Sequence, residues 1–263
     1  MSAAKPVTLI TGASEGIGRA IAIELARQGQ HLLLLARNEK ALKALAIELQ
    51  SDHAITIHIC PLDLARKDRI DILNKCLDGN HIYVEALVNN AAIGLCDAFT
   101  DHTRQDLLQL VDLNTTALTE LCHEYLPAMV KRGRGGILNI ASLAGLIPGP
   151  YQAAYYASKA YVISLTESLA QENRGNNVSI SVSVPGPVNT KFHEKMGAGR
   201  ALYLRAFGTM DPEQVALSSL RGWSQNRTII TPGLLNTFAF LTLPLMPHTL
   251  ISPIFAWLLK PRP

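Results

Sequence analysis

The stretch Thr11-Gly12-Ala13-Ser14-Glu15-Gly16-Ile17-Gly18 decides the fold of this chain. It follows an apolar run at residues 7–10 and leads into a segment where Ile17, Ile21 and Leu25 recur every four residues, the period of a buried helix side. A glycine-rich loop between a strand and a helix lets the backbone approach a pyrophosphate, and the helix N-terminus offers unpaired N–H groups to that anion. The spacing is GxxxGxG rather than GxGxxG, so the position of the loop, more than its pattern, indicates a dinucleotide site.

Beyond this loop, short β-branched or leucine-rich runs alternate with longer segments of helical period. This alternation is typical of βαβ units around a parallel sheet. We expect strands at residues 7–10, 32–35, 55–59, 86–88, 137–140, 178–184 and 227–230. Further helices are expected after Asn38 and at residues 65–77, 105–131 and 153–174, the second of these three kinked at Pro127. Right-handed crossovers then predict one α/β domain over residues 1–263, a Rossmann-type doubly wound parallel sheet of about seven strands with helices on both faces.

The composition excludes several classes of protein. Of 263 residues, 48% are hydrophobic and 17% are charged, which suits a globular core and not a disordered chain. The net charge is +3 without a basic stripe, so we expect no nucleic-acid partner. The 4 cysteines and 8 histidines show no metal-ligand spacing, and we expect no metal site. With no N-terminal signal segment, a cytoplasmic protein with reduced thiols is the expectation.

Residues 228–263 form an unusual C-terminal extension. Residues 228–259 contain no Asp, Glu, Lys or Arg, and four prolines interrupt this apolar run. A bilayer-spanning helix needs about 20 consecutive apolar residues, which these breaks do not leave. We favour a segment buried against the body of the protein or against a subunit neighbour. Peripheral membrane contact, or contact with a lipid-like substrate, is the alternative.

The end of the second expected strand indicates which dinucleotide binds. An acidic side chain there accepts a hydrogen bond from the ribose 2′-OH, whereas an arginine pairs with a 2′-phosphate. This chain has Ala36 and Arg37 at that place, which favours NADP over NAD. Glu15 in the glycine loop counts against this choice, because its charge would lie near the phosphate.

Three side chains with matching chemistry follow later in the chain. Tyr155 and Lys159 lie four residues apart near the start of an expected helix, so they project from one face. A nearby ammonium favours phenolate, and we therefore expect the pKa of Tyr155 to be lowered toward the range of a general acid or base. Ser142 ends the preceding strand, where its hydroxyl can bond a substrate oxygen.

With these motifs in order, the chain resembles the short-chain dehydrogenase/reductase family, in its single-domain form, along nearly its whole length to about Ile230. The matching positions are the loop at 11–18, Asp63 within Leu62-Asp63-Leu64, Asn89-Asn90-Ala91-Ala92, Asn114, Ser142, Tyr155, Lys159 and the stretch 185–190. Ala92 stands where the family usually has glycine, a mild departure, since alanine is small but lacks the backbone freedom of glycine.

The resemblance implies a role for each matching position. Tyr155 would transfer the proton, Ser142 would polarise the carbonyl, and Lys159 would hold the nicotinamide ribose and tune Tyr155. Asn114 would hold a water that links Lys159 to solvent. The residues expected to contact the cofactor are Gly12, Ser14, Glu15, Gly16, Ile17, Gly18, Arg37, Asp63, Leu64, Asn90, Ala91, Ala92, Tyr155, Lys159, Pro185, Gly186, Val188 and Thr190.

These roles predict an oxidoreductase that transfers a hydride between NADP(H) and a carbonyl or secondary alcohol. Residues 191–210 are expected to form a substrate lid, with apolar side chains that suit a lipophilic ketone or aldehyde. Ile93, Leu95, Leu143, Ile147 and Tyr151 are expected on the opposite wall. The resemblance also suggests a homodimer or homotetramer built through residues 105–131 and 153–174. A catalytically silent dinucleotide-binding sensor or scaffold is the alternative function.

Overall fold

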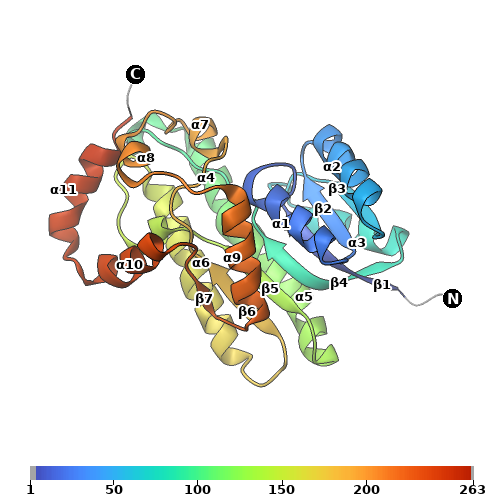
Figure 1. Cartoon of the computed structure of the whole chain (residues 1–263). Coiled ribbons are helices and arrows are strands. Elements are labelled where there is room, and N and C mark those ends of the chain that lie inside the picture. The colour runs from blue at the N-terminus through green and yellow to red at the C-terminus, as the bar shows by residue number, and fades with distance from the viewer. Residues whose placement is uncertain (1–3, 262–263) are drawn as a thin grey trace.

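Parallel strands form the centre of the molecule (Figure 1). The computed structural model describes residues 4–261 and contains one seven-stranded sheet in the order β3-β2-β1-β4-β5-β6-β7. The strands are β1 (Lys5–Thr11), β2 (Leu32–Ala36), β3 (Ile57–Pro61), β4 (Ile82–Asn89), β5 (Gly136–Ile140), β6 (Ser179–Ser183) and β7 (Ile229–Ile230). The predicted doubly wound sheet is confirmed. Strand order reverses between β1 and β4, which is where such a sheet opens a crevice for ligands.

Helices cover both faces of the sheet because the strands are apolar on both sides. In β2, Leu32 and Leu34 pack toward one layer and Leu33 and Leu35 toward the other. One layer holds α1 (Gly16–Arg27), α2 (Glu39–Asp52) and α9 (Pro212–Ser224), and the other holds α3 (Arg69–Gly79), α5 (Leu118–Arg132) and α6 (Ala153–Glu172). Helix α3 begins four residues later than the expected helix at 65–77.

The expected long helix at 105–131 contains an irregular turn. Helix α4 (Arg104–Val111) continues through a π-helical turn (Asp112–Ala117) into α5. Helix α5 includes Pro127 and continues to Arg132, so the proline does not end the helix. Single π turns inside α-helices are often found at functional sites, and this one carries Asn114.

Two segments beyond β6 form a third cluster outside the two layers. The lid segment folds into α7 (Phe192–Lys195) and α8 (Leu202–Phe207), and the extension folds into α10 (Leu234–Thr242) and α11 (His248–Leu259). Met196 and Tyr203 of the lid pack with Ile251 and Leu258 of α11. The extension therefore packs through one side only, while Leu234, Leu250 and Trp257 are largely exposed. Within residues 4–261, no helix is long and apolar enough to cross a membrane.

Candidate active site

A cavity of about 710 Å³ lies at the carboxyl ends of the strands. The glycine loop after β1, the ends of β2, β4 and β5, and the loop after β6 contribute to its lining. The lid helices and α10 contribute the remaining wall. Its volume lies in the usual range for ligand sites, about 300–1,000 Å³. The fold thus places one large cavity where the sequence predicts dinucleotide binding.

The glycine loop approaches the strand β4 end so closely that side chains do not fit there. Gly12 has φ +65°, and a Cβ at this position would lie 2.8 Å from Nδ2 of Asn90. A Cβ at Gly18 would lie 2.3 Å from the Gly12 carbonyl oxygen. The Asn90 amide donates to the carbonyl oxygens of Thr11 and Gly12 at 3.1 and 3.2 Å, so its side chain holds the loop. This cradle of bare backbone suits a pyrophosphate.

Most of the expected cofactor residues line this cavity. The lining includes Gly12, Ser14, Glu15, Gly16, Ile17, Arg37, Asp63, Leu64, Asn90, Ala91, Ala92, Tyr155, Lys159, Pro185, Gly186, Val188 and Thr190. Gly18 is not part of the lining; it packs against the Gly12 backbone and allows helix α1 to approach the loop. The residues present therefore form a continuous surface for an extended dinucleotide.

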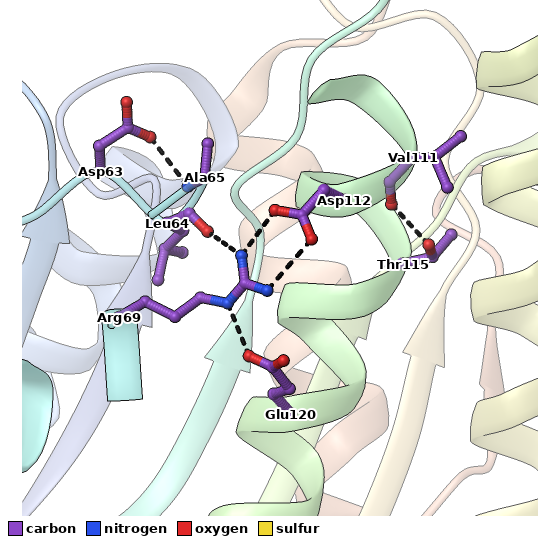
Figure 2. Close-up of polar contacts among 8 residues, drawn as sticks. All are labelled: Asp63, Leu64, Ala65, Arg69, Val111, Asp112, Thr115 and Glu120. Atoms are coloured by element: carbon purple, nitrogen blue, oxygen red, sulfur yellow. Dashed lines mark hydrogen bonds and ion pairs between the residues drawn. The ribbon is translucent and has the colours of Figure 1, made fainter. Parts of the chain in front are cut away.

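Arg69 fastens the loop after β3 to the π turn (Figure 2). Its buried guanidinium donates to the Leu64 carbonyl oxygen at 2.6 Å, forks onto Asp112 at 2.7 and 3.1 Å, and reaches Glu120 at 2.6 Å. Asp63 accepts a hydrogen bond from the Ala65 N–H at 3.0 Å, which fixes the turn itself. One side chain thus positions both the Asp63–Leu64 wall of the cavity and the turn that carries Asn114.

Tyr155, Ser142 and Lys159 meet in the cavity. Lys159 is 5% exposed, its Nζ donates to the Ile140 carbonyl oxygen at 2.9 Å, and it lies 5.8 Å from the centre of the Tyr155 ring. Ser142 donates to the Pro185 carbonyl oxygen at 3.4 Å and accepts from the Ala144 N–H at 3.2 Å. The Tyr155 phenol, the buried amino group of Lys159 and the Ser142 hydroxyl therefore line one cavity.

The expected lowering of the Tyr155 pKa is not what the structure shows. Burial raises the pKa of Tyr155 to about 12, and a hydrogen bond with Ser142 only partly opposes this rise. Burial also lowers the pKa of Lys159 to about 8. Lys159 donates to a backbone carbonyl oxygen rather than to the phenol. The loss of water around Tyr155 therefore outweighs the attraction of the Lys159 ammonium for a phenolate.

Asn114 lies behind the cavity and does not line it. It is buried, its Oδ1 accepts from the Ile93 N–H at 3.0 Å, and its Nδ2 donates to the Ile93 carbonyl oxygen at 2.9 Å and to Ser158 Oγ at 3.0 Å. The side chain thereby ties the π turn to Ile93, which does line the cavity, and to helix α6 next to Lys159. The Asn114 side chain therefore contacts Ile93 and Ser158 and not the cavity itself.

The lid closes directly over the tyrosine. The Phe192 ring lies 5.5 Å from that of Tyr155, centre to centre, and Met196, Tyr203 and Phe207 also line the cavity. Ile93, Leu143 and Ile147 form part of the lining as expected. Leu95 and Tyr151 do not; they face a small separate pocket, because the chain at 95–99 turns away toward α4.

Several residues that line the cavity were not predicted from the sequence. Gln152, His193 and Asn236 all line the cavity, and Tyr203 bonds His193 Nδ1 at 2.8 Å. Burial lowers the pKa of His193, so the imidazole is neutral at neutral pH. Asn236 is the only Asn or Gln between residues 228 and 259, a signal that was available in the sequence. Across residues 4–261, no group of three or more His, Cys, Asp or Glu side chains is arranged to hold a metal.

The comparison with known families decides the identity of this fold and site. The family model described as short chain dehydrogenase matches residues 6–201. The chain belongs to the short-chain dehydrogenase/reductase family. This short-chain dehydrogenase is 32% identical over 176 residues to a very-long-chain 3-oxoacyl-CoA reductase of Laccaria bicolor, which covers 65% of this chain and 52% of the fungal enzyme. It is 36% identical over 185 residues to a sulfoacetaldehyde reductase of Chromohalobacter salexigens, over 70% and 72% of the two chains.

Solved structures agree with this assignment. A short-chain dehydrogenase from Sphingobium yanoikuyae in complex with NADPH superposes with a TM-score of 0.82 and 29% identity, over 94% of this chain and 95% of that one. A bulky-bulky ketone specific alcohol dehydrogenase from Comamonas testosteroni gives a TM-score of 0.78 and 28% identity, over 94% of both chains. This short-chain dehydrogenase is thus an oxidoreductase with a nicotinamide dinucleotide cofactor.

Proposed function

We propose that this short-chain dehydrogenase is an NADP(H)-dependent oxidoreductase that interconverts a lipophilic ketone or aldehyde and its alcohol. One observation carries the proposal: Tyr155, Ser142 and Lys159 share a large cavity with the glycine loop and with an apolar lid. When bound, the nicotinamide supplies or accepts the hydride. The protein then has to hold the carbonyl and handle one proton.

The residues divide this work in a specific way. With its pKa raised to about 12, the Tyr155 phenol stays protonated at neutral pH and can donate its proton to the oxygen that forms the alcohol. Ser142 offers a hydroxyl to the same oxygen. Lys159 is held in the cavity wall by its hydrogen bond to the Ile140 carbonyl oxygen and can return a proton to Tyr155 through solvent. Phe192 over the tyrosine excludes water from the reacting carbonyl.

Two features support NADP over NAD. Arg37 is exposed at the end of β2 and lines the cavity, where a guanidinium can form a fork with a 2′-phosphate. Glu15, whose charge argued against NADP, is paired with Lys195 of the lid. The pair neutralises the carboxylate, so Arg37 dominates the charge near the proposed phosphate site.

The substrate proposal rests on the cavity wall. Phe192, Met196, Ile147, Leu243 and Phe255 give it a mostly apolar surface beyond the tyrosine. The names of the Laccaria bicolor and Comamonas testosteroni relatives, a very-long-chain 3-oxoacyl-CoA reductase and a bulky ketone dehydrogenase, fit the same chemistry. The sulfoacetaldehyde reductase shows the contrasting case of a small anionic substrate at similar identity.

The test is a set of initial rates with NADPH and NADH on matched carbonyls. We expect lipophilic ketones to exceed sulfoacetaldehyde and other small hydrophilic carbonyls in kcat/KM. Tyr155→Phe should lower kcat at least about 100-fold while NADPH still binds. Rates near normal in this variant would refute the role of Tyr155. If the natural protein binds NADPH but turns over no carbonyl or alcohol, the sensor or scaffold alternative holds.

A matched pair of variants tests the preference for NADPH over NADH. Arg37→Ala should raise the KM for NADPH about 10-fold or more and leave the KM for NADH nearly unchanged, because only NADP carries the 2′-phosphate. Lys40→Ala removes a cation from the neighbouring helix α2, outside the cavity lining, and should change neither constant. Equal or better kcat/KM with NADH in the natural protein would contradict the proposal.

The assembly and the location are proposed on separate grounds. A homodimer or homotetramer through α4, α5 and α6 fits the exposed Leu108 and Val111 of α4 and Tyr161 of α6. A cytoplasmic protein fits the four cysteines, which are all unpaired. Light scattering on the purified chain measures the assembly directly.

A further inference from the structure

Helices α10 and α11 leave an apolar surface uncovered in the described chain. On α11, Leu250, Ile254 and Trp257 are 65%, 55% and 62% exposed and recur at helical spacing. The opposite side of α11 packs inward through Ile251 and Leu258. We call the exposed residues of the extension the apolar tail face; they are Leu234, Leu235, Phe238, Leu241, Leu245, Met246, Leu250, Ile254 and Trp257.

This apolar tail face contains no charge and is bordered by positive charge. Residues 228–259 carry no Asp, Glu, Lys or Arg, and Lys260 follows immediately, exposed at the end of α11. Next to α11 lies the lid helix α8, whose Phe207 stacks on Phe255 with ring centres 6.3 Å apart. Arg205 of α8 is exposed beside α11. An apolar surface with a basic border is complementary to an anionic lipid surface.

The cavity opens at the same face. Leu235, Phe238 and Phe207 are 81%, 68% and 57% exposed, yet all three also line the cavity. A molecule dissolved in an apolar layer against this surface would therefore meet the cavity entrance without crossing water. In Figure 1, α10 and α11 lie at the end of the molecule opposite α2 and α3.

We propose that the apolar tail face binds the surface of an anionic phospholipid bilayer, with α10 and α11 in the headgroup layer and the cavity entrance turned toward the lipid. Binding to the bilayer depends only on the apolar tail face and its basic border. The consequence that a lipophilic ketone enters from the bilayer rests on the proposed function. A second copy of the chain fits less well, because a twofold contact here would cover Leu235 and Phe238 at the entrance and bring two basic borders together.

The first test measures vesicle binding by the full-length protein, without any activity assay. We expect co-flotation with vesicles of phosphatidylcholine and phosphatidylglycerol, and weaker binding to phosphatidylcholine alone. The double variant Leu245→Glu and Leu250→Glu lies outside the cavity lining and should lower binding at least about 10-fold, since two charges enter the apolar layer. Ile47→Glu is the control, because Ile47 is 70% exposed on α2, and it should bind like the natural protein.

The second test addresses the basic border. Arg205→Glu on α8 should weaken binding to anionic vesicles and leave binding to phosphatidylcholine unchanged. Arg174→Glu makes the same charge change at an exposed position after α6 and should have no effect. NADPH binding and the thermal unfolding midpoint of each variant verify that it folds.

Three outcomes would overturn the proposal. The first is that the natural protein binds neither kind of vesicle. The second is that Ile47→Glu weakens binding as much as the double variant does. The third is that the double variant converts a dimer into a monomer in light scattering while the natural protein ignores vesicles, which would make the face a subunit contact. None of these outcomes bears on turnover of a dissolved ketone, so the proposed function is tested separately.

Discussion

Lys195 of the lid helix α7 is paired with Glu15 of the glycine loop, 180 residues earlier in the chain. Glu15 lines the cavity from the glycine loop and Lys195 lines it from the lid, so their ion pair joins the lid to the loop. The side chains are 59% and 49% exposed, which limits such a pair to about 1 kcal/mol or less. The ion pair is therefore a weak latch, which can open when a cofactor binds or leaves.

Removal of this latch should speed release of NADPH. Lys195→Met is expected to raise the NADPH dissociation rate up to about fivefold, the factor that corresponds to about 1 kcal/mol. The charge swap Glu15→Lys with Lys195→Glu should restore much of the slow rate, because the pair forms again in reverse. Stopped-flow measurement of NADPH fluorescence gives the rates. A swap that releases NADPH as fast as Lys195→Met would show that the pair does not hold the lid.

Loss of the Arg69 guanidinium should destabilise the protein. Arg69→Met leaves Asp112 and Glu120 without their partner and the Leu64 carbonyl without its donor, at a cost of about 3 kcal/mol in the free energy of unfolding. The neighbouring Arg66 pairs with Asp68 at the surface, so Arg66→Met should leave the free energy of unfolding nearly unchanged. Urea unfolding of both variants makes the comparison. Equal changes in the free energy of unfolding would show that the buried hydrogen bonds of Arg69 stabilise the protein no more than a surface ion pair does.

Lys159 should make stability depend on pH. Its pKa is lowered from 10.5 to about 8 by burial, so between these values the unfolded chain holds a proton that the folded chain lacks. The free energy of unfolding of the natural protein then rises through this interval, by up to about 3 kcal/mol, since one pKa unit is about 1.4 kcal/mol. Lys159→Met lacks this rise.

The measurement is the difference in the free energy of unfolding, Lys159→Met minus natural protein, at pH 7, 8, 9 and 10. The difference should decrease as pH increases, because groups common to both proteins cancel. A difference that stays constant across this range would show that Lys159 titrates normally in the folded protein.

The approach of the glycine loop to helix α1 predicts a steric effect. A Cβ at Gly18 would meet the Gly12 carbonyl oxygen at 2.3 Å, and backbone there cannot yield without distorting the loop. Gly18→Ala should therefore destabilise the protein by about 2 kcal/mol and weaken NADPH binding at least about 10-fold. Gly79→Ala at the end of α3 meets nothing within 4 Å and should be neutral or slightly stabilising. If the two variants behaved alike, close packing at Gly18 would not matter.

Local patterns predict much of the scaffold. Alternating leucines in β2 and the four-residue spacing of Ile17, Ile21 and Leu25 depend only on which side chains share a face, so the sheet and its two helical layers follow from them. Strand β3 begins two residues later than expected and helix α3 begins four residues later. Local patterns do not reveal that Arg69, the first residue of α3, bonds Asp112 and Glu120, which are far away in the chain.

The amino-acid sequence by itself determined the fold class, and the place of the glycine loop and of Tyr155 and Lys159 within it, because these depend on residue type and short-range spacing. Tertiary structure alone decided which groups face one another. It raised the pKa of Tyr155 through burial, moved the Asn114 side chain behind the wall, paired Lys195 with Glu15 and left the apolar tail face exposed. Water exclusion and long-range pairing set these properties, and both arise only after the chain has folded.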